Sequence, residues 1–426
     1  MLNIVSVMQK TDFFEIDRNI VRYNLINLKQ LVFEVTDSCN LRCKYCAYAE
    51  LYNKYDERKN QHLSFDKTKR IIDYLVDLWK NNSSDSFIQP MTISFYGGEP
   101  LMNYKLIKEI VSYVESIRNS NRKFSFSMTT NAVLLDKYMD FLVEKKFNIL
   151  ISLDGDEYGH SYRINVQGEN SFEKIMKNVK TLQKKHPEYF HKFINFNSVL
   201  HNRNSVDGIH HFIKNEFSKE PTISTLSDSG IRKDKIDEFW QTYQNRYSSI
   251  KNAPNCDALE TELFITNPDT ARLMFYLHGY SGNVYNYYTD LFIDKAQMSY
   301  PPTATCLPFL RKMFVTVNGK ILPCERISHE FSAGRVSDSE VDLDFEKIAA
   351  QHNDYVFRYQ KQCGVCAVKK NCRQCVYTID NINTPDTKCP GFTSQLDFQQ
   401  NERRIVSYLS RHPELYGRIM KEVRVS

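Results

Sequence analysis

The chain of 426 residues contains no segment suited to crossing a membrane or to directing secretion. Its apolar runs are all shorter than the roughly 20 residues that a transmembrane helix needs. Charged side chains at Lys10, Asp12, Glu15 and Arg18 interrupt the beginning of the chain, where a secretory signal requires an unbroken apolar core. These absences predict a cytoplasmic protein with no membrane partner.

Blocks of basic residues are also missing. Lys and Arg number 56 against 51 Asp and Glu, and they are spread along the chain, so the net charge is only +5. Nucleic-acid-binding domains concentrate Lys and Arg on one face or in one segment. The sequence therefore predicts no nucleic-acid partner. Its length and its hydrophobic content of 42% predict more than one domain with a core of its own.

Cysteine, in contrast, is plentiful and unevenly placed. Of 11 cysteines, three lie at positions 39–46 and seven lie after residue 305. Without a secretory signal, we expect a reducing environment in which cysteines bind metals rather than form disulfides. The remaining one, Cys256, stands outside both groups and is expected to be a buried structural thiol.

The first cysteine group follows a predicted strand. Residues 31–36 are rich in β-branched and aromatic side chains, and Cys39, Cys43 and Cys46 come next with the spacing C-x3-C-x2-C. A helix is expected to begin near Lys44. Three thiolates can hold three irons of a four-iron cluster and leave the fourth iron without a protein ligand. The alternatives are ordinary thiols and a structural zinc site, which normally needs a fourth Cys or His nearby.

Strand-like and helix-like patterns alternate from residue 31 to about residue 225. Such alternation predicts a parallel sheet with crossover helices, and the catalytic groups of such folds lie at the carboxyl ends of the strands. The predicted strands are 31–36, 91–96, 124–130, 147–153, 193–200 and 221–225, and the predicted helices are 66–80, 103–118, 136–145, 171–185 and 205–217.

A glycine pair follows the second predicted strand in the motif Gly97-Gly98-Glu99-Pro100. From the residues alone, the glycines allow either a close approach of the backbone to a ligand or a tight turn. The cysteine triplet and this motif together resemble the radical S-adenosylmethionine (SAM) superfamily, whose GGEP motif the sequence matches in full. The resemblance implies an α/β fold with a partial (βα)6 TIM-type barrel. It also implies that the open iron binds SAM, which is cleaved to a 5′-deoxyadenosyl radical that abstracts a hydrogen atom from the substrate.

The same resemblance implies SAM contacts at the strand ends. In the family the GGEP motif holds the amino group of SAM, and a serine and an arginine at the positions of Ser152 and Arg163 contact its ribose and carboxylate. Guanidinium groups suit this role because they clamp carboxylates through two hydrogen bonds. Asp154 is expected to orient Arg163 or the substrate, or to be only a turn residue. The predicted SAM-binding residues are Gly97, Gly98, Glu99, Pro100, Asn131, Ser152, Arg163 and Leu200.

The seven later cysteines resemble the SPASM domain, an iron–sulfur extension of radical SAM enzymes that modify peptides and proteins. The resemblance implies two further [4Fe-4S] clusters beside the one that binds SAM, so that the expected total is three. The spacing of Cys372 and Cys375 is one residue shorter than is common in the family, and the cysteines at 363–375, seen in isolation, are also typical of a zinc ribbon. The distal cluster is assigned Cys363, Cys366, Cys372 and Cys389, and the nearer cluster is assigned Cys306, Cys324 and Cys375, which leaves one of its irons without a cysteine.

Glu325 directly follows Cys324, after a predicted strand at 313–317 and a hairpin turn at 317–320. The sulfatase-maturing branch of the family has an aspartate at this place that accepts a proton from the substrate. The resemblance therefore implies that Glu325 is a catalytic base, a role for which it must lie within hydrogen-bonding reach of the proton. An ion pair with Arg326 or with another cation is the alternative.

The sequence divides into segments of different character. Residues 236–250 and residues 393–408 are each expected to form one amphipathic helix, and an aromatic run lies at 283–288. The predicted segments are an N-terminal strand or hairpin extension (1–30), the radical SAM partial barrel (31–230), a bridging region (231–300), the SPASM domain (301–392), and a C-terminal helix and tail (393–426).

Over nearly its whole length the chain resembles a radical SAM–SPASM peptide maturase. The resemblance implies hydrogen abstraction from a ribosomally synthesised precursor peptide, giving a thioether or carbon–carbon crosslink or another oxidised residue. It also implies a flavodoxin or ferredoxin as reductant. The alternatives are an anaerobic sulfatase-maturing enzyme that makes formylglycine and, from another class, a non-catalytic iron–sulfur electron-transfer module.

Overall fold

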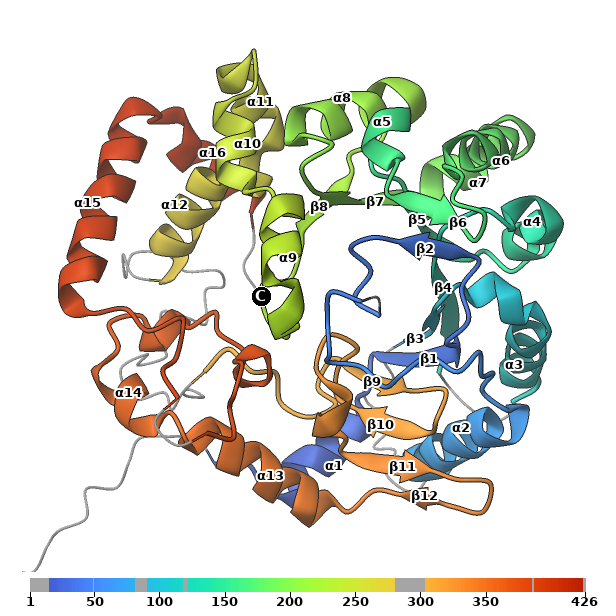
Figure 1. Ribbon diagram of the computed structural model, residues 1–426. Helices are drawn as coiled ribbons and strands as arrows, with labels where there is room; N and C mark the ends of the chain where they lie inside the picture. Colours follow the sequence, from blue (N-terminus) through green and yellow to red (C-terminus); the bar gives the residue numbers. More distant parts are fainter. Residues whose placement is uncertain are drawn as a thin grey trace, which may run out of the picture. The chain divides into compact units, whose positions relative to one another are not determined.

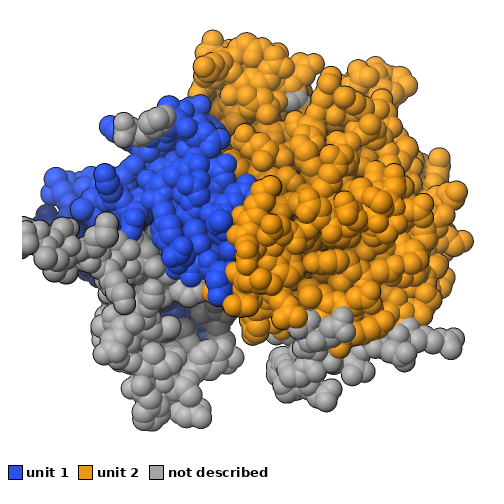
Figure 2. Space-filling model, turned by 90° about the horizontal axis from the view of Figure 1, so that it is seen from below, with its two compact units in different colours: residues 1–17, 261–305, 349–426 blue, residues 18–260, 306–348 orange. Residues whose placement is uncertain are grey.

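The computed structural model describes residues 15–48, 50–80, 90–117, 122–279, 303–384 and 387–423 (Figure 1). The chain divides into two compact units (Figure 2). Unit 1 contains residues 1–17, 261–305 and 349–426, and unit 2 contains residues 18–260 and 306–348. Among the helices in the described ranges, none is long and apolar enough to span a lipid bilayer.

Unit 2 is built on a sheet in which the six predicted strands are all parallel. Their side chains on the helix-covered face, such as Phe33, Phe95, Ile151 and Phe196, are at most 1% exposed, as expected where crossover helices cover a parallel sheet. The observed limits differ from the predicted ones by no more than one residue, and the predicted α/β fold is confirmed. In spatial order the strands are β1 (Gln30–Thr36), β3 (Met91–Gly97), β4 (Phe124–Thr130), β5 (Asn148–Ser152), β7 (Ile194–Leu200) and β8 (Thr222–Thr225).

The five helices predicted for this region lie between successive strands and cover the outer side of the sheet (Figure 1). Each buries one apolar face because its apolar residues recur every three or four positions. In the first of them Ile71, Ile72, Leu75 and Val76 are buried. The helices are α2 (Phe65–Lys80), α3 (Tyr104–Ser116), α4 (Leu135–Glu144), α6 (Phe172–Lys185) and α8 (Val206–Phe217).

Further strands extend the sheet beyond β1. Strand β9 (Lys312–Val315) pairs parallel with β1, and β10 (Lys320–Leu322) returns antiparallel to β9, which confirms the predicted hairpin. Gly319 in its turn has a φ of +80°, and a Cβ there would lie 2.2 Å from the carbonyl oxygen of Val336. Glycine is therefore required at this turn. Strands β11 (Gly334–Val336) and β12 (Val341–Asp342) complete this side of the sheet.

The structure corrects two predictions close to the first strand. The described residues before β1 form a helix, α1 (Arg18–Ile26), and not a strand or hairpin, because buried side chains recur there one helical turn apart. No helix begins near Lys44. Instead, β2 (Leu41–Cys43) pairs antiparallel with β6 (Arg163–Asn165), and Lys44 lies in the turn that follows. The pairing partner is distant in the sequence, so the local pattern does not reveal it.

The single helix predicted over 236–250 is wrong, since two helices are found there. Helix α9 (Ile236–Thr242) ends first, and α10 (Arg246–Lys251) begins after Asn245. The side chain of Asn245 accepts a hydrogen bond of 3.1 Å from the backbone N–H of Ser248, which is the contact of a helix N-cap. A local cap therefore interrupts the amphipathic pattern.

Unit 1 has an apolar core of its own around α12 (Pro268–Gly279), α15 (Gln395–Arg411) and α16 (Glu414–Glu422). The predicted C-terminal helix is α15, but the predicted tail contains the further helix α16, whose Ile419 is fully buried. The aromatic run at 283–288 lies outside the described residues.

The remaining α-helices in the described ranges of the two units are α5 (Glu157–His160), α7 (Pro187–Phe193), α11 (Cys256–Leu263), α13 (Phe345–Phe357) and α14 (Gln360–Val365).

Candidate functional site

The three cysteines of the first group lie in and around β2, in the loop that follows β1. Each sulfur faces a hydrogen-bond donor that a different segment of unit 2 provides, in one case an amide and in two cases a guanidinium group. Such donors stabilise the negative charge of thiolates and of an iron–sulfur cluster. The pairs are Asn131 Nδ2 with Cys39 Sγ at 3.9 Å, Arg163 Nη1 with Cys43 Sγ at 3.9 Å, and Arg58 Nη2 with Cys46 Sγ at 3.8 Å.

Two of these thiols, those of Cys39 and Cys43, do not ionise readily by themselves. Burial raises the pKa of Cys39 to about 11 and the pKa of Cys43 to about 12, although Arg58 and Arg163 act in the opposite direction. Because the thiolate is the form that binds metal, iron must displace the thiol protons. Within the described ranges, no three Cys, His, Asp or Glu side chains lie close enough together to hold a single metal ion. Three thiols that face one amide and two guanidinium groups fit an iron–sulfur cluster, in which each thiolate binds a different iron.

The glycine pair at the end of β3 packs directly on the stem of the cysteine loop. A Cβ on Gly97 would lie 2.1 Å from the carbonyl oxygen of Thr36, and a Cβ on Gly98 would lie 2.0 Å from that of Ser38. The backbone N–H groups of Gly98 and Glu99 donate to these two oxygens, each at 2.9 Å. The glycines therefore hold the loop that carries Cys39, and their predicted contact with SAM stays a prediction.

Replacing Gly98 with Ala is expected to remove about four of the roughly 12 irons that three clusters would hold. The new Cβ would overlap backbone and not a flexible side chain, so the stem of the cysteine loop must shift. Iron per chain after anaerobic reconstitution is the measurement. Gly417→Ala is the matched control, because a Cβ there would meet nothing within 4 Å. A Gly98→Ala protein with full iron content would show that the loop tolerates the shift.

Glu99 is a buried carboxylate that joins the ends of β3 and β4. It is 1% exposed, and it accepts hydrogen bonds from Leu101 N at 3.1 Å, Thr130 Oγ1 at 2.7 Å and Asn131 N at 2.8 Å. Burial raises its pKa to about 7, although these three hydrogen bonds favour the charged form. Glu99 thereby positions Asn131, whose amide faces Cys39. Pro100 begins the short 3-10 helix that follows.

Asp154 and Arg163 form a fully buried ion pair with two hydrogen bonds. Arg163 Nε donates to Asp154 Oδ2 at 2.8 Å, and Arg163 Nη2 donates to Asp154 Oδ1 at 3.0 Å. Burial opposes the charge on Asp154, but Arg163 and the hydrogen bonds hold the pKa of Asp154 well below its usual range. The hydroxyl of Tyr45 and the backbone N–H of Val199 also donate to Asp154. Of the alternatives for Asp154, the structure supports orientation of Arg163, whose Nη1 faces Cys43.

The other predicted SAM-binding residues lie at the same edge of the sheet. Ser152 is the last residue of β5, Leu200 is the last residue of β7, and Asn131 follows β4. This edge is formed by the carboxyl ends of the parallel strands, and it also carries the cysteine loop. The structure thus brings these residues to one edge, and their contacts with SAM stay predictions. Sequence reasoning missed Arg58, because an arginine in a charged loop has no pattern that points to Cys46.

A polar cavity of about 280 Å³ lies within unit 2. Its hydroxyl and amide groups form a chain in which Gln30 Nε2 donates to Ser94 Oγ at 2.7 Å and Ser94 Oγ lies 2.6 Å from Ser127 Oγ. Asn195, one of two asparagines of β7 at 195 and 197, lines the cavity. Tyr96 also lines it, and burial together with the nearby Glu325, Tyr55 and Cys46 raises the pKa of Tyr96. Tyr96 therefore lies within electrostatic range of the cysteine loop and of Glu325.

Glu325 lines the same cavity and is largely buried, with a side chain that is 14% exposed. Its Oε1 accepts a hydrogen bond of 2.9 Å from Lys312 Nζ, while Arg326 Nε is more distant at 3.9 Å. Oε2 lies 3.7 Å from Cys324 Sγ. The main cation partner is therefore Lys312, which the sequence did not identify. The carboxylate therefore lines the cavity, and its role as a base stays a prediction.

The four cysteines that were assigned to the distal cluster lie together in unit 1. All four line one small cavity beside Tyr359, Gln362 and Val376. Burial and the nearby sulfurs raise the pKa of Cys363 to about 12. The three cysteines of the nearer set are divided between the units, since Cys306 and Cys324 belong to unit 2 and Cys375 belongs to unit 1, and their assignment stays a prediction. The distal cysteines are Cys363, Cys366, Cys372 and Cys389.

Part of the chain is similar to a known family and to known proteins. The family model described as the Radical SAM superfamily matches residues 33–214. A cysteine-type anaerobic sulfatase-maturating enzyme from Clostridium novyi is 30% identical over 45% of this chain and 49% of its own length. The radical SAM cyclopropyl synthase TigE from Paramaledivibacter caminithermalis is 27% identical over 51% of this chain and 43% of its own length. The matched part thus spans about half the length of these relatives.

Solved structures share the fold of the chain. The structure of anSMEcpe with bound AdoMet aligns with a TM-score of 0.60 and 18% identity, over 93% of this chain and 100% of that one. The same protein with bound AdoMet and the Kp18Cys peptide aligns with a TM-score of 0.59 and 17% identity, over 92% of this chain and 98% of that one. The described architecture therefore corresponds to a known fold along most of its length.

Proposed function

Because the model of the Radical SAM superfamily matches residues 33–214, we propose that the protein is an enzyme that abstracts a hydrogen atom from a ribosomally synthesised precursor peptide. The product is a thioether or carbon–carbon crosslink or another oxidised residue. The reductant is a flavodoxin or ferredoxin, and the protein acts in the cytoplasm. When bound, SAM and the first cluster supply the 5′-deoxyadenosyl radical, and the two auxiliary clusters supply an acceptor for the electron that the substrate loses.

The observation that carries this proposal is the position of the polar cavity. Tyr96 lines it within electrostatic range of both Cys46 and Glu325. A peptide side chain in this cavity would therefore lie beside Tyr96 and the carboxylate of Glu325. The chain holds the radical source through Cys39, Cys43 and Cys46, and it orients the substrate through the hydroxyl and amide groups of the cavity wall. Orientation of this kind supplies a large part of an enzymatic rate.

The hydrogen balance of the proposed reaction requires a proton acceptor, and we assign this role to Glu325. Crosslinking removes two hydrogens from the peptide, of which one leaves as an atom and the other leaves as a proton and an electron. Among the described residues that line the cavity, Glu325 is the one carboxylate. Glu325 accepts this proton, and Lys312, at 2.9 Å, holds its carboxylate in place.

Glu325→Gln is expected to lower product formation about 100-fold or more, which is the usual effect of a lost general base. Formation of 5′-deoxyadenosine from SAM should continue, because the glutamine leaves the first cysteine group unchanged. Both products are measured in the same anaerobic reaction. The matched control is Glu330→Gln, which changes an exposed glutamate of the same segment. Normal product yield from Glu325→Gln would exclude the role of base.

The second candidate is a sulfatase-maturing enzyme that oxidises Cys or Ser to formylglycine, and the similarity to the Clostridium novyi enzyme favours it. Anaerobic co-expression with a small peptide encoded beside the gene distinguishes the two by mass. Loss of two hydrogens per event supports crosslinking or oxidation of the precursor. Conversion of a cysteine to an aldehyde in a sulfatase peptide supports the alternative. A non-catalytic electron-transfer module predicts no 5′-deoxyadenosine from SAM at all.

A further inference from the structure

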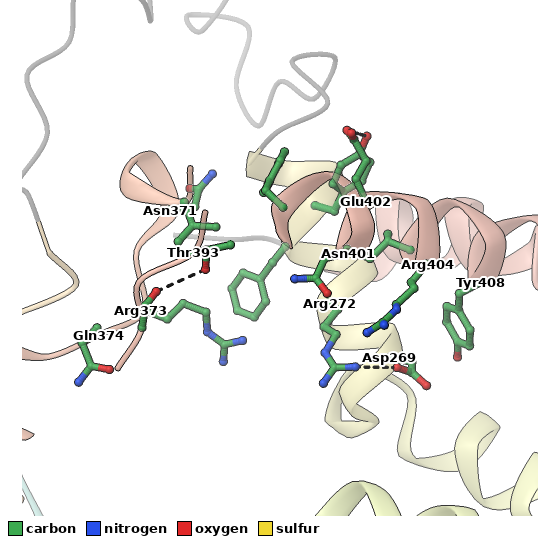
Figure 3. A pocket seen from close by; sticks show the side chains of 16 residues that line it. Asp269, Arg272, Asn371, Arg373, Gln374, Thr393, Asn401, Glu402, Arg404 and Tyr408 are labelled. Atoms are coloured by element: carbon green, nitrogen blue, oxygen red, sulfur yellow. Dashed lines mark hydrogen bonds and ion pairs between the residues drawn. The ribbon is translucent and has the colours of Figure 1, made fainter. Parts of the chain in front are cut away.

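A second pocket, of about 500 Å³, lies wholly in unit 1 and has no part in the proposed chemistry. Helix α12 contributes Asp269 and Arg272, helix α15 contributes Asn401 and Arg404, and the loop at 371–374 closes one end (Figure 3). Its volume is typical of ligand sites, which lie between about 300 and 1,000 Å³. The pocket therefore has the size to hold a few amino-acid residues.

The walls of this pocket are aromatic with arginines between them. The guanidinium of Arg373 stacks at 4.3 Å over the ring of Phe275, an arrangement that leaves the edge of the guanidinium available for hydrogen bonds. Tyr276, Phe398 and Tyr408 add further aromatic surface. Apolar walls with a few fixed polar groups are characteristic of binding sites for small molecules and peptides.

Both carboxylates of this pocket have a partner within it, whereas two of its arginines have no carboxylate partner among the described residues. Asp269 binds Arg272 at 3.1 Å, and Glu402 accepts a hydrogen bond of 2.8 Å from the hydroxyl of Tyr276. Among the described residues, no carboxylate lies within ion-pair distance of Arg404, and the same is true of Arg373. The pocket thus presents cationic groups that the described part of the chain does not neutralise. An anionic ligand would satisfy them.

We propose that this pocket binds an acidic and apolar segment of the precursor peptide, outside the residues that are modified. A peptide carboxylate pairs with Arg404, and a neighbouring apolar side chain lies on the aromatic wall. The amide side chains of Asn371 and Asn401, which line the pocket, can both donate and accept hydrogen bonds, as a peptide backbone requires. The proposal rests on the proposed function, since it takes the ligand to be part of the substrate.

Other ligands fit less well. Asp269 and Glu402 line the pocket and would repel a polyanion such as a nucleotide. A single carboxylate would instead neutralise the excess positive charge of the three arginines in the lining. A globular reductant docks through a broad surface of about 800 Å² per partner, and a hollow of this size does not offer one. The pocket shares Gln374 and Gly391 with the cavity of the distal cysteines, so its occupant would lie close to them in unit 1.

The test compares Arg404→Gln with Arg403→Gln in the anaerobically reconstituted holoprotein. The two arginines are adjacent and exposed on α15, but only Arg404 lines the pocket. The probe is a peptide with the sequence Gly-Ser-Phe-Glu-Leu-Gly that carries a neutral fluorophore and an amidated carboxyl terminus, so that Glu is its one carboxylate, and binding is read by fluorescence anisotropy. Arg404→Gln should weaken binding about tenfold, the effect of one lost charge-assisted hydrogen bond, while Arg403→Gln should bind like the wild type.

A second measurement uses the wild-type protein alone. The same peptide with Gln in place of its Glu should bind the wild-type protein more weakly, and Arg404→Gln should not weaken the binding of this Gln peptide further. Equal binding of the two peptides, or equal effects of the two variants, overturns the proposal. The proposal is also overturned if Arg404→Gln is reduced more slowly by flavodoxin while its peptide binding is unchanged, because the pocket would then bind the reductant. Anisotropy requires no turnover, so absence of 5′-deoxyadenosine from the wild type would count against the proposed function and not against this site.

Discussion

Replacing Cys39, Cys43 and Cys46 together with Ala is expected to abolish the formation of 5′-deoxyadenosine from SAM. These three thiols are the predicted ligands of the first cluster, and each faces a donor from unit 2 that stabilises negative charge. No other cysteine is near enough in the sequence to replace them, since the next is Cys256. Iron should fall from about 12 to about 8 per chain, because one of the three predicted clusters would be lost.

The matched control for this variant is Cys256→Ala. Cys256 lies at the start of α11, where its sulfur is 3.4 Å from Glu260 Oε1, and it belongs to neither cysteine group. Iron content and 5′-deoxyadenosine formation should be unchanged. Continued cleavage of SAM by the triple variant would contradict the assignment of the first cluster. Loss of iron from Cys256→Ala would show that the division into cysteine groups is wrong.

The second large effect is expected from Asp154→Asn, which should lower the free energy of unfolding by about 3–5 kcal/mol. The substitution leaves the guanidinium of Arg163, which is 7% exposed, without its compensating charge. It also disturbs the hydrogen bonds that Tyr45 and Val199 donate to the same carboxylate. Loss of one member of a buried ion pair is costly because the remaining charge stays desolvated.

Denaturant unfolding of the metal-free protein measures this effect without interference from the clusters. Asp140→Asn is the control, since that carboxylate is 93% exposed and lies 3.9 Å from His186, and exposed pairs contribute about 1 kcal/mol or less. Asp154→Asn should also reduce SAM cleavage, because Arg163 loses the partner that orients it toward Cys43. If Asp154→Asn and Asp140→Asn lower the free energy of unfolding by the same amount, the buried pair of Asp154 and Arg163 does not stabilise the fold as we infer.

The strand and helix limits of the sheet region could be predicted closely because the relevant signals are local. A strand such as 124–130 and a helix such as 172–185 each show their own period of apolar residues, whatever else the chain does. The cysteine spacing and the GGEP motif are equally local. Predictions failed where a distant partner or a local cap decides the structure. Residues 41–43 pair with 163–165, and the cap at Asn245 divides the predicted helix.

The sequence by itself determined the α/β architecture, the cysteine groups and the identity of the residues at the strand ends. Only the tertiary structure showed that Gly97 and Gly98 hold the stem of the cysteine loop, that Glu99 positions Asn131, and that Lys312 is the partner of Glu325. The physical reason is distance along the chain. Periodic burial is a property of one segment, whereas an ion pair or a backbone contact depends on which segments the sheet places side by side.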